Sequence, residues 1–439
     1  MAGACCLAWF APVPAQTGAA DAPTLIGGIV ENYRKVIVLH GSGADRLSAQ
    51  RTMAGHYLFF QNRQAVAQLV DLAVRDAGAC RGTVETWRSG AGWLDVDRLA
   101  LGGVFTELEL KLDADSPCLT GVKVARRDLQ AIRAEYNREV TAVLDDRRET
   151  VAGHRPKWAA YLKFLSQRYS IDKILAELEL NTPAKASKVR PAGTAQALAR
   201  RAADDEWSDG DLPDKTILLT FDDGPHPVYT SRILDVLAKY QVRAVFFLIG
   251  QNLGAIDKDG NTTLREPELV ARMLREGHAL ANHTHTHPLL PRLDEIHLTD
   301  EIDVTEVLLN SATPQGLGRA KLFRPPYGAR NDLVLTETAA RGLRSVLWNV
   351  DSRDWADPIP QSVAARVLKE IAHAGHGIVL FHDIHPRTVD AIAIVIEKLR
   401  QKGYRFAHFE DGKLVVDAVP DGKVLGPAGP GSTKEGAAP

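Results

Sequence analysis

The sequence lacks an excess of either charge, a long apolar run and a glycine-rich nucleotide-binding signature. Its 53 Lys and Arg residues stand against 55 Asp and Glu residues, which gives a formal net charge of −2 at pH 7. This balance provides no general attraction to nucleic acid or to an anionic membrane surface. No run of about 18 or more apolar residues occurs, so we expect no internal transmembrane helix. A GxGxxG segment is also missing, which argues against a dinucleotide-binding sheet.

Cysteine is scarce as well, with only Cys5, Cys6, Cys80 and Cys118 in the chain. None of them lies near the candidate site segments described below, so we expect no cysteine ligand to a metal there. Cys80 and Cys118 either pair in an oxidising compartment or are two separate small core residues. The sequence leaves both readings open.

The first 15 residues are apolar and uncharged, and they end in Val13-Pro14-Ala15, which resembles a signal-peptide cleavage site. We interpret residues 1–23 as a signal peptide or leader, although the basic residues that usually begin one are missing. An apolar tail and a lipidated Cys5 are the alternatives. A leader predicts a periplasmic or extracellular location.

A length of 439 residues favours two or more domains. Residues 24–182 carry apolar side chains at spacings of three and four, which predicts a domain of amphipathic helices. This region has no chemical motif, and scaffolding, partner binding and glycan presentation all stay open as its role. Residues 183–213 are predicted to form a linker. Residues 419–439 are rich in Gly, Pro and Ala and are predicted to be disordered.

Residues 214–418 alternate between short apolar runs and helical patterns. The predicted strands are 216–221, 244–249, 278–282, 322–324, 345–350, 377–381 and 404–408. The predicted helices are 231–240, 266–276, 299–309, 332–341, 359–374 and 389–402. This alternation indicates an α/β fold with a parallel sheet and helices outside it. About seven such units favour a β/α barrel, preceded by the mostly helical domain.

Five short segments lie at, or just after, the C-terminal ends of predicted strands. They are Thr220–Pro225 (TFDDGP), His283–His287 (HTHTH), Phe323–Gly328 (FRPPYG), Asp351–Trp355 (DSRDW) and Leu380–Asp383 (LFHD). In a β/α barrel these ends converge on one face, where active sites lie. Each segment alone could be a surface turn, but the five together predict a site for metal-assisted hydrolysis.

Two histidines and a carboxylate form the candidate metal set. His283 and His287 are spaced i, i+4, which places both imidazoles on one side of a helical turn or tight loop. Together with one carboxylate they make a zinc set that leaves room for water. Adjacent side chains on an extended backbone diverge, so Asp222 and Asp223 are expected to take separate roles. His285 is expected to point away from its two neighbours.

The remaining polar residues complete the predicted site. Arg324, held by two prolines, can pair with a carboxylate and keep it ionised. The N–H of Tyr327 on the same rigid loop suits an oxyanion. His382, at the mouth of a buried strand, is a candidate general acid. Asp354 can orient a histidine, and Trp355 can form the wall of a small pocket.

With these motifs in order, residues from about 216 to 416 resemble the polysaccharide deacetylase family, the NodB-homology domain of carbohydrate esterase family 4. The resemblance covers slightly under half of the chain, and the helical region lies outside it. It implies a distorted (β/α) barrel and metal-dependent removal of acetyl groups from N-acetylglucosamine-type sugars. Residues 257–266 are expected to be a loop insertion relative to the family.

The resemblance also implies a role for each residue. Asp223, His283 and His287 would be the metal ligands, with zinc expected and Co²⁺, Ni²⁺ or Mn²⁺ as alternatives. Asp222 would be the general base held by Arg324, and His382 the general acid tuned by Asp354. The remaining predicted site residues are Tyr327, for the oxyanion, and Trp355 and Leu380, for the acetyl methyl group.

The function predicted from these residues is N-deacetylation of an acetylated polysaccharide, such as peptidoglycan, a chitin-like oligomer or an exopolysaccharide. An O-acetyl esterase acting on a xylan-type polymer would use the same site and is the first alternative. A non-catalytic glycan-binding protein is the second, although no motif residue is lost. No nucleic-acid partner is expected, and a protein partner of the helical domain stays open.

Overall fold

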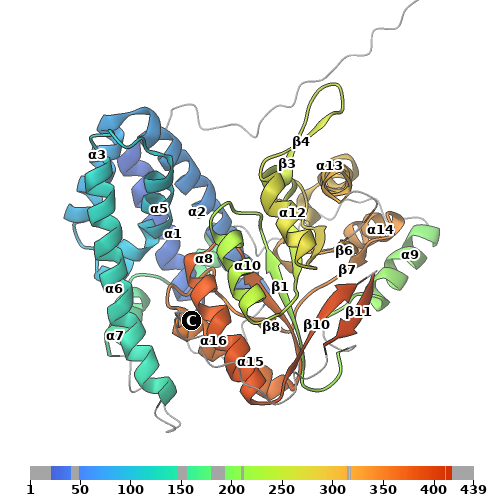
Figure 1. Cartoon of the computed structure of the whole chain (residues 1–439). Helices are drawn as coiled ribbons and strands as arrows, with labels where there is room; N and C mark the ends of the chain where they lie inside the picture. The colour runs from blue at the N-terminus through green and yellow to red at the C-terminus, as the bar shows by residue number, and fades with distance from the viewer. Residues whose placement is uncertain are drawn as a thin grey trace, which may run out of the picture.

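The computed structural model describes residues 21–40, 49–145, 156–178, 193–208, 212–313, 316, 318–410 and 412–417. A helical region (blue to teal) precedes a β/α barrel (green to red), and the two pack against each other (Figure 1). The predicted leader and tail lie outside the described residues, apart from the short stretch 21–23. Among the described residues, no helix is both long enough and apolar enough to cross a membrane.

The helical region consists of short and long helices around a core of its own. Its helices are α1 (Ala22–His40), α2 (Ala49–Arg75), α3 (Ala77–Ser89), α4 (Asp95–Arg98), η1 (Leu99–Leu101), α5 (Gly102–Lys111), α6 (Leu119–Asp145), α7 (Pro156–Ser166) and α8 (Ile171–Glu177). The buried faces meet around Ile29, Val84, Phe105 and Val122. The amphipathic pattern therefore does form helices that bury one face, as predicted.

Two polar features hold this helical core together. Cys80 in α3 forms a disulfide with Cys118, immediately before α6, which answers the pairing question that the sequence left open. Asp97 is fully buried, and its carboxylate accepts hydrogen bonds from Arg34 Nε at 2.8 Å and Tyr161 Oη at 2.6 Å. A buried charge is tolerated when it is paired and hydrogen-bonded in this way.

The barrel is a curled, mostly parallel sheet in which six of the seven predicted strands appear as single strands. The strands are β1 (Thr216–Asp222), β2 (Val245–Leu248), β5 (Ala279–Asn282), β6 (Arg319–Phe323), β7 (Arg344–Ser345), β8 (Val350–Asp351), β9 (Gly377–His382), β10 (Arg405–Glu410) and β11 (Lys413–Val416). The predicted strand 345–350 is present only as its two ends, in β7 and β8, which pair with different neighbours. Among the described strands no ladder joins β7 to β8, so the barrel is distorted and open there.

Strand β1 lies at the centre of the sheet. It pairs with β9 along one side, and with β10 and then β2 along the other. The order continues through β5 and β6 to β7, and β11 runs antiparallel beside β10. Side chains alternate between two faces, as a strand requires. Leu219 and Phe221 of β1 face the core beneath the helices, whereas Leu218 belongs to the cluster inside the barrel.

Helices cover the outside of the sheet, and their ends follow ordinary capping rules. They are α10 (Tyr229–Lys239), α12 (Pro267–Arg275), α13 (Glu295–Ala312), α14 (Asp332–Ala340), α15 (Pro360–Ala374) and α16 (Pro386–Gln401). Three of them begin at proline, which is preorganised for a first helical turn. Asp294 and Asn331 cap α13 and α14 with their side chains. Gly375 ends α15 with a left-handed φ of 84°.

Two segments differ from the sequence prediction. The expected loop at 257–266 includes the second strand of a small hairpin, β3 (Gly254–Ile256) and β4 (Thr262–Leu264), which follows the short helix α11 (Gly250–Leu253). Part of the expected linker 183–213 is helix α9 (Gly193–Asp204), which packs against α14. Trp207 then continues along the sheet edge and bridges Val346. Its indole buries apolar area inside the barrel end, which explains why this part of the chain is packed rather than extended.

Candidate active site

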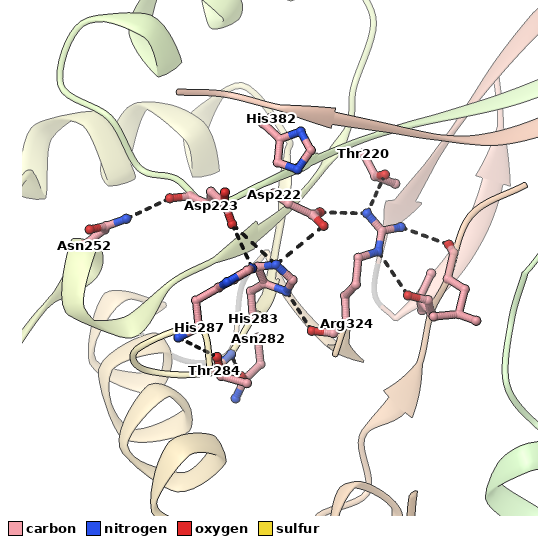
Figure 2. A network of polar contacts seen from close by, with 12 residues as sticks. Thr220, Asp222, Asp223, Asn252, Asn282, His283, Thr284, His287, Arg324 and His382 are labelled. Atoms are coloured by element: carbon pink, nitrogen blue, oxygen red, sulfur yellow. Dashed lines mark hydrogen bonds and ion pairs between the residues drawn. The ribbon is translucent and has the colours of Figure 1, made fainter. Parts of the chain in front are cut away.

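The five sequence segments meet at the C-terminal end of the sheet. Asp222 and His382 are the last residues of β1 and β9, and they are register partners on these neighbouring strands. His283 follows β5 directly, and Arg324 follows β6. Residues far apart in sequence therefore converge because parallel strands end at the same edge, as predicted (Figure 2).

Asp223, His283 and His287 form a compact and buried cluster. Each offers a ligand atom, and these atoms lie within 4.8 Å of one another. The Nε2 atoms of His283 and His287 lie 3.5 Å and 3.4 Å from Asp223 Oδ1. His283 Nδ1 lies 2.7 Å from the carbonyl oxygen of Arg324, so it can donate there and leave Nε2 free as a ligand. The donor set and its convergence fit a divalent metal such as zinc.

The electrostatics of the cluster agree with that fit. Burial raises the pKa of a carboxyl, but the nearby His287 imidazole and Arg63 guanidinium outweigh it and lower the pKa of Asp223 well below its usual value. Burial also lowers the pKa of His287 well below its ordinary value. The cluster thus holds an ionised carboxylate beside a neutral imidazole, which are the protonation states that bind a metal.

Asp222 is clamped separately from Asp223. Its Oδ1 accepts a hydrogen bond from Arg324 Nη1 at 2.7 Å, while Oδ2 faces His283 Nε2 at 3.6 Å. Arg324 is fully buried and also donates to Thr220 Oγ1 at 2.8 Å and to the carbonyl oxygen of Val346 at 3.0 Å. The guanidinium is therefore fixed on several sides. Arg324 thereby holds the Asp222 carboxylate in a fixed orientation.

His382 is held by Asp354 on the opposite side of the cluster. Its Nδ1 lies 2.7 Å from Asp354 Oδ1, and its backbone N–H donates to Asp354 Oδ2 at 2.8 Å. Thr388 Oγ1 donates to the same Oδ2 at 2.6 Å. Burial disfavours the imidazolium, but the carboxylates of Asp354, Asp223 and Asp222 outweigh it and raise the pKa of His382 to about 9. With Nδ1 committed to Asp354, Nε2 is the atom left to exchange a proton.

Left-handed backbone conformations concentrate in the same segments. Positive φ angles occur at Asp223 (79°), Thr284 (67°), His287 (60°), Tyr327 (62°) and Arg353 (52°). Such conformations cost about 1–3 kcal/mol each in residues other than glycine, and they persist where surrounding structure enforces them. Here they follow the strand ends and turn the side chains toward a common centre.

The remaining predicted residues also lie at this end of the barrel. Tyr327 is buried, and its phenol donates to the carbonyl oxygen of His287 at 3.1 Å. Leu380 is fully buried and lies two residues before His382 on β9, so strand alternation places it on the same face. Trp355 is 2% exposed and packs against the helical region. His285 points toward Gly250 and Thr305, away from the cluster, as expected.

Sequence reasoning missed two groups at the site. Asp383 accepts a hydrogen bond from Thr230 Oγ1 and lies so close to Gly224 that a Cβ there would clash with its Oδ2. Asp383 is the last residue of the LFHD segment, and this position is the sequence signal that could have indicated it. The second group is on α2, where His56, Phe60 and Arg63 contact site residues. The sequence of α2 shows only an apolar periodicity. That periodicity predicts that one face of the helix is buried, but it does not indicate which part of the protein covers that face.

Comparison with known proteins identifies the family. The sequence model described as Polysaccharide deacetylase matches residues 209–346. A chitooligosaccharide deacetylase of Bradyrhizobium sp. (strain ANU 289) is 38% identical over 204 residues, which cover 43% of this chain and 87% of that protein. A peptidoglycan-N-acetylglucosamine deacetylase of Bacillus cereus (strain ATCC 14579) is 37% identical over 198 residues, covering 44% and 85%.

A third relative has a different overall length. The peptidoglycan-N-acetylmuramic acid deacetylase PdaC of Bacillus subtilis (strain 168) is 36% identical over 192 residues, which cover 44% of this chain and 37% of that protein. Taken with the two relatives above, which are aligned over most of their length, these matches show that the chain belongs to the polysaccharide deacetylase family.

Proposed function

We propose that this protein is a metal-dependent deacetylase that hydrolyses N-acetyl groups of an N-acetylglucosamine-type glycan. The observation that carries the proposal is that the adjacent carboxylates of Asp222 and Asp223 have different partners. One carboxylate is clamped by Arg324, and the other faces two imidazoles that can share a metal. The printed names of the relatives, which act on chitooligosaccharides or peptidoglycan, support a glycan amide as substrate.

The proposed ligands are Asp223, His283 and His287, and zinc is the proposed ion. When bound, the ion would polarise the acetyl carbonyl and lower the pKa of a water at the site. Asp222, held in position by Arg324, removes a proton from the water that attacks the carbonyl carbon. The N–H of Tyr327 donates to the oxygen on which negative charge develops.

His382 completes the proposed reaction. Its Nε2 gives a proton to the sugar nitrogen as the carbon–nitrogen bond breaks, which yields acetate and a free amine. An amide nitrogen is a poor leaving group unless it is protonated, so a group that still carries a proton at neutral pH is needed. The pKa of His382, raised to about 9, satisfies that need. Asp354 holds the imidazole in the tautomer that directs Nε2 inward.

A periplasmic or extracellular location belongs to the same proposal. The support is the disulfide between Cys80 and Cys118, because structural disulfides persist mainly in oxidising compartments. The acetylated polymers of the cell envelope are found there.

The test is acetate release from chitooligosaccharides, peptidoglycan, poly-N-acetylglucosamine and acetylxylan. Metal-stripped and zinc-restored protein are compared with Asp222→Asn, and exposed Asp300 supplies the matched control Asp300→Asn. We expect zinc-dependent release from an N-acetylated glycan that Asp222→Asn abolishes and Asp300→Asn retains. Release from acetylxylan alone would replace the amidase assignment with an O-acetyl esterase. Full activity in Asp222→Asn would remove Asp222 from the role of base.

A further inference from the structure

The mouth of the site is covered by one face of α2. His56, Phe59, Phe60 and Arg63 follow the spacing i, i+3, i+4, i+7, which places them on one side of a helix. All four point into the predicted site. As a result the catalytic and ligand side chains are almost inaccessible: Asp222 is 3% exposed, Asp223 2%, His283 2%, His287 6% and His382 4%.

The aromatic side chains of α2 contact residues of the predicted site and aromatic rings at its mouth. His56 has ring centroids 4.2 Å from Trp355 and 6.0 Å from His382, and it is stacked at 6.3 Å on Trp348. Phe60 is stacked on the ligand His287 at 4.6 Å. Aromatic faces at the mouth of a binding site are natural stacking surfaces for a ligand. Here α2 occupies them.

Arg63, on the same face of α2, contacts the predicted metal cluster directly. Its Nη1 lies 3.0 Å from Asp223 Oδ2, and the Asp223 side chain is only 3% exposed. A guanidinium paired with this carboxylate neutralises the charge that a divalent cation would neutralise. Two cations on one buried carboxylate repel each other, so metal loading and the Arg63 contact oppose one another.

The packing of α2 on the barrel is close, but several buried polar atoms near it have no hydrogen-bond partner. Gly55 permits the approach, since a Cβ there would clash with His40 Nε2 and lie 2.7 Å from Trp355 Cη2. Yet His40 Nδ1 and Nε2, His56 Nε2 and Trp355 Nε1 are buried with no hydrogen-bond partner among the described residues. Buried polar groups in permanent interiors are nearly always paired. Unpaired polar groups at this interface lower the cost of opening it, because water can reach them once α2 withdraws.

We infer that α2 is an intramolecular occupant of the substrate groove and that the chain, with α2 docked, is in a latent form. The glycan-competent form is one in which α2 has withdrawn from Trp355 and Arg63 has left Asp223. The identity of the groove as a glycan groove rests on the proposed function, whereas its occupation by α2 rests on the contacts above. By linkage, anything that loads the metal cluster favours withdrawal, and withdrawal tightens metal binding by the same factor.

Two variants of the full-length protein test the inference independently. Arg63→Ala removes the guanidinium together with its methylene stem, and Arg75→Ala, on the same helix with a side chain 81% exposed, is its control. Gly55→Leu wedges α2 away from Trp355. Its control is Gly28→Leu on α1, where an added Cβ would meet nothing within 4 Å. Thermal melting of each variant verifies folding before any comparison is made.

The readouts are zinc affinity by calorimetry, hydrogen exchange of α2, and acetate release from a soluble chitooligosaccharide. We expect Arg63→Ala to bind zinc at least about fivefold more tightly than the wild type, the lower end of typical coupling between sites. Zinc loading of the wild type, and Gly55→Leu without zinc, should both accelerate exchange in α2. Acetate release should rise in Arg63→Ala and Gly55→Leu and stay at the wild-type level in both controls.

The opposite results separate the two proposals. Weaker zinc binding or slower acetate release in Arg63→Ala would make Arg63 a working part of the site and would overturn latency. Unchanged zinc affinity together with unchanged α2 exchange would overturn it as well. If zinc affinity and exchange shift as expected but no variant releases acetate from any glycan, α2 occupancy stands and the proposed substrate class falls.

Discussion

The barrel and the helical region carry information in different ways. In the barrel, short polar segments at strand ends indicate a chemical function, because Asp, His and Arg in those positions contribute little to core packing. In the helical region, the residues that reach the site are an ordinary helix face of one His, two Phe and one Arg. A motif can be recognised from its own residues, whereas a covering face acquires its meaning only from what it covers.

The sharpest way to test this division is to remove a ligand from the barrel. We expect His283→Ala to lower acetate release on the order of 10⁴-fold, because Lewis-acid polarisation contributes several kcal/mol to such reactions. Zinc stoichiometry and acetate release measure the effect, and far-UV circular dichroism shows whether the helices persist. His297→Ala is the matched control, since its side chain is 63% exposed and lies outside the site. Retention of bound zinc in His283→Ala would exclude His283 from the ligand set.

The buried pair of the site should differ from a surface pair of the same barrel. Arg324→Gln leaves the Asp222 charge buried and without its partner, so we expect a loss of about 3–5 kcal/mol in unfolding free energy. Arg341→Gln, which breaks partly exposed pairs with Asp303 and Glu337, should cost less, about 1 kcal/mol. Urea denaturation measures the unfolding free energy of each variant relative to the wild type. Equal losses would mean that Arg324 is no more important to stability than a surface arginine.

The helical region should respond to loss of its disulfide without a change in site chemistry. The double variant Cys80→Ala and Cys118→Ala should lose about 2–4 kcal/mol of stability in this region. Zinc stoichiometry below the melting transition should stay at the wild-type value, because no ligand is touched. Reductant should reproduce the loss in the wild type and leave the variant unaffected. A fall in zinc content would show that the helical region supports the metal cluster, which contradicts the covering role inferred for α2.

The smallest expected change is a shift in pH dependence. A general acid must carry its proton, so the activity contributed by His382 is present below its pKa and lost as pH rises above it. Asp354 helps to raise that pKa to about 9. Asp354→Asn should therefore move the alkaline limb of the rate profile to lower pH by about 1 unit or more. Asp300→Asn should leave the limb in place. A shift to higher pH would contradict the assignment of His382 as the proton donor.

Much of the barrel followed from the sequence because its signals are local. Apolar runs predicted the strands, and a turn or polar motif after each run predicted which ends meet. The segment 345–350 was predicted as one strand, yet its two ends pair with different strands and its middle residues do not join a ladder. That outcome depends on curvature of the whole sheet. Trp207, expected in a linker, is packed because a tertiary contact with the barrel end was available to it.

Strand polarity explains which of the predicted site residues lie together, whereas helix docking determines neighbours that the sequence did not indicate. Asp222, Asp223, His283, His287 and His382 converge as expected because strand polarity alone brings them together. Arg63 could not be predicted as their neighbour, because 160 positions separate it from Asp223 and helix periodicity names no partner. Trp355 is predicted to line an acetyl pocket, and the sequence did not indicate that its ring also contacts His56 of α2 and His40. Such contacts are decided by how two regions dock.

The central position of β1 also sets the order in which this chain can fold. Thr220 in β1 bonds to Val379 in β9 across 159 positions, and β10 follows later still. Contacts of such long sequence separation form slowly, and chains fold from the N-terminus as they are synthesised. The helical region, whose disulfide spans only 38 positions, can be complete before β9 and β10 exist. If the helical region folds first, the barrel closes against an α2 that is already formed, and the site is covered as it assembles.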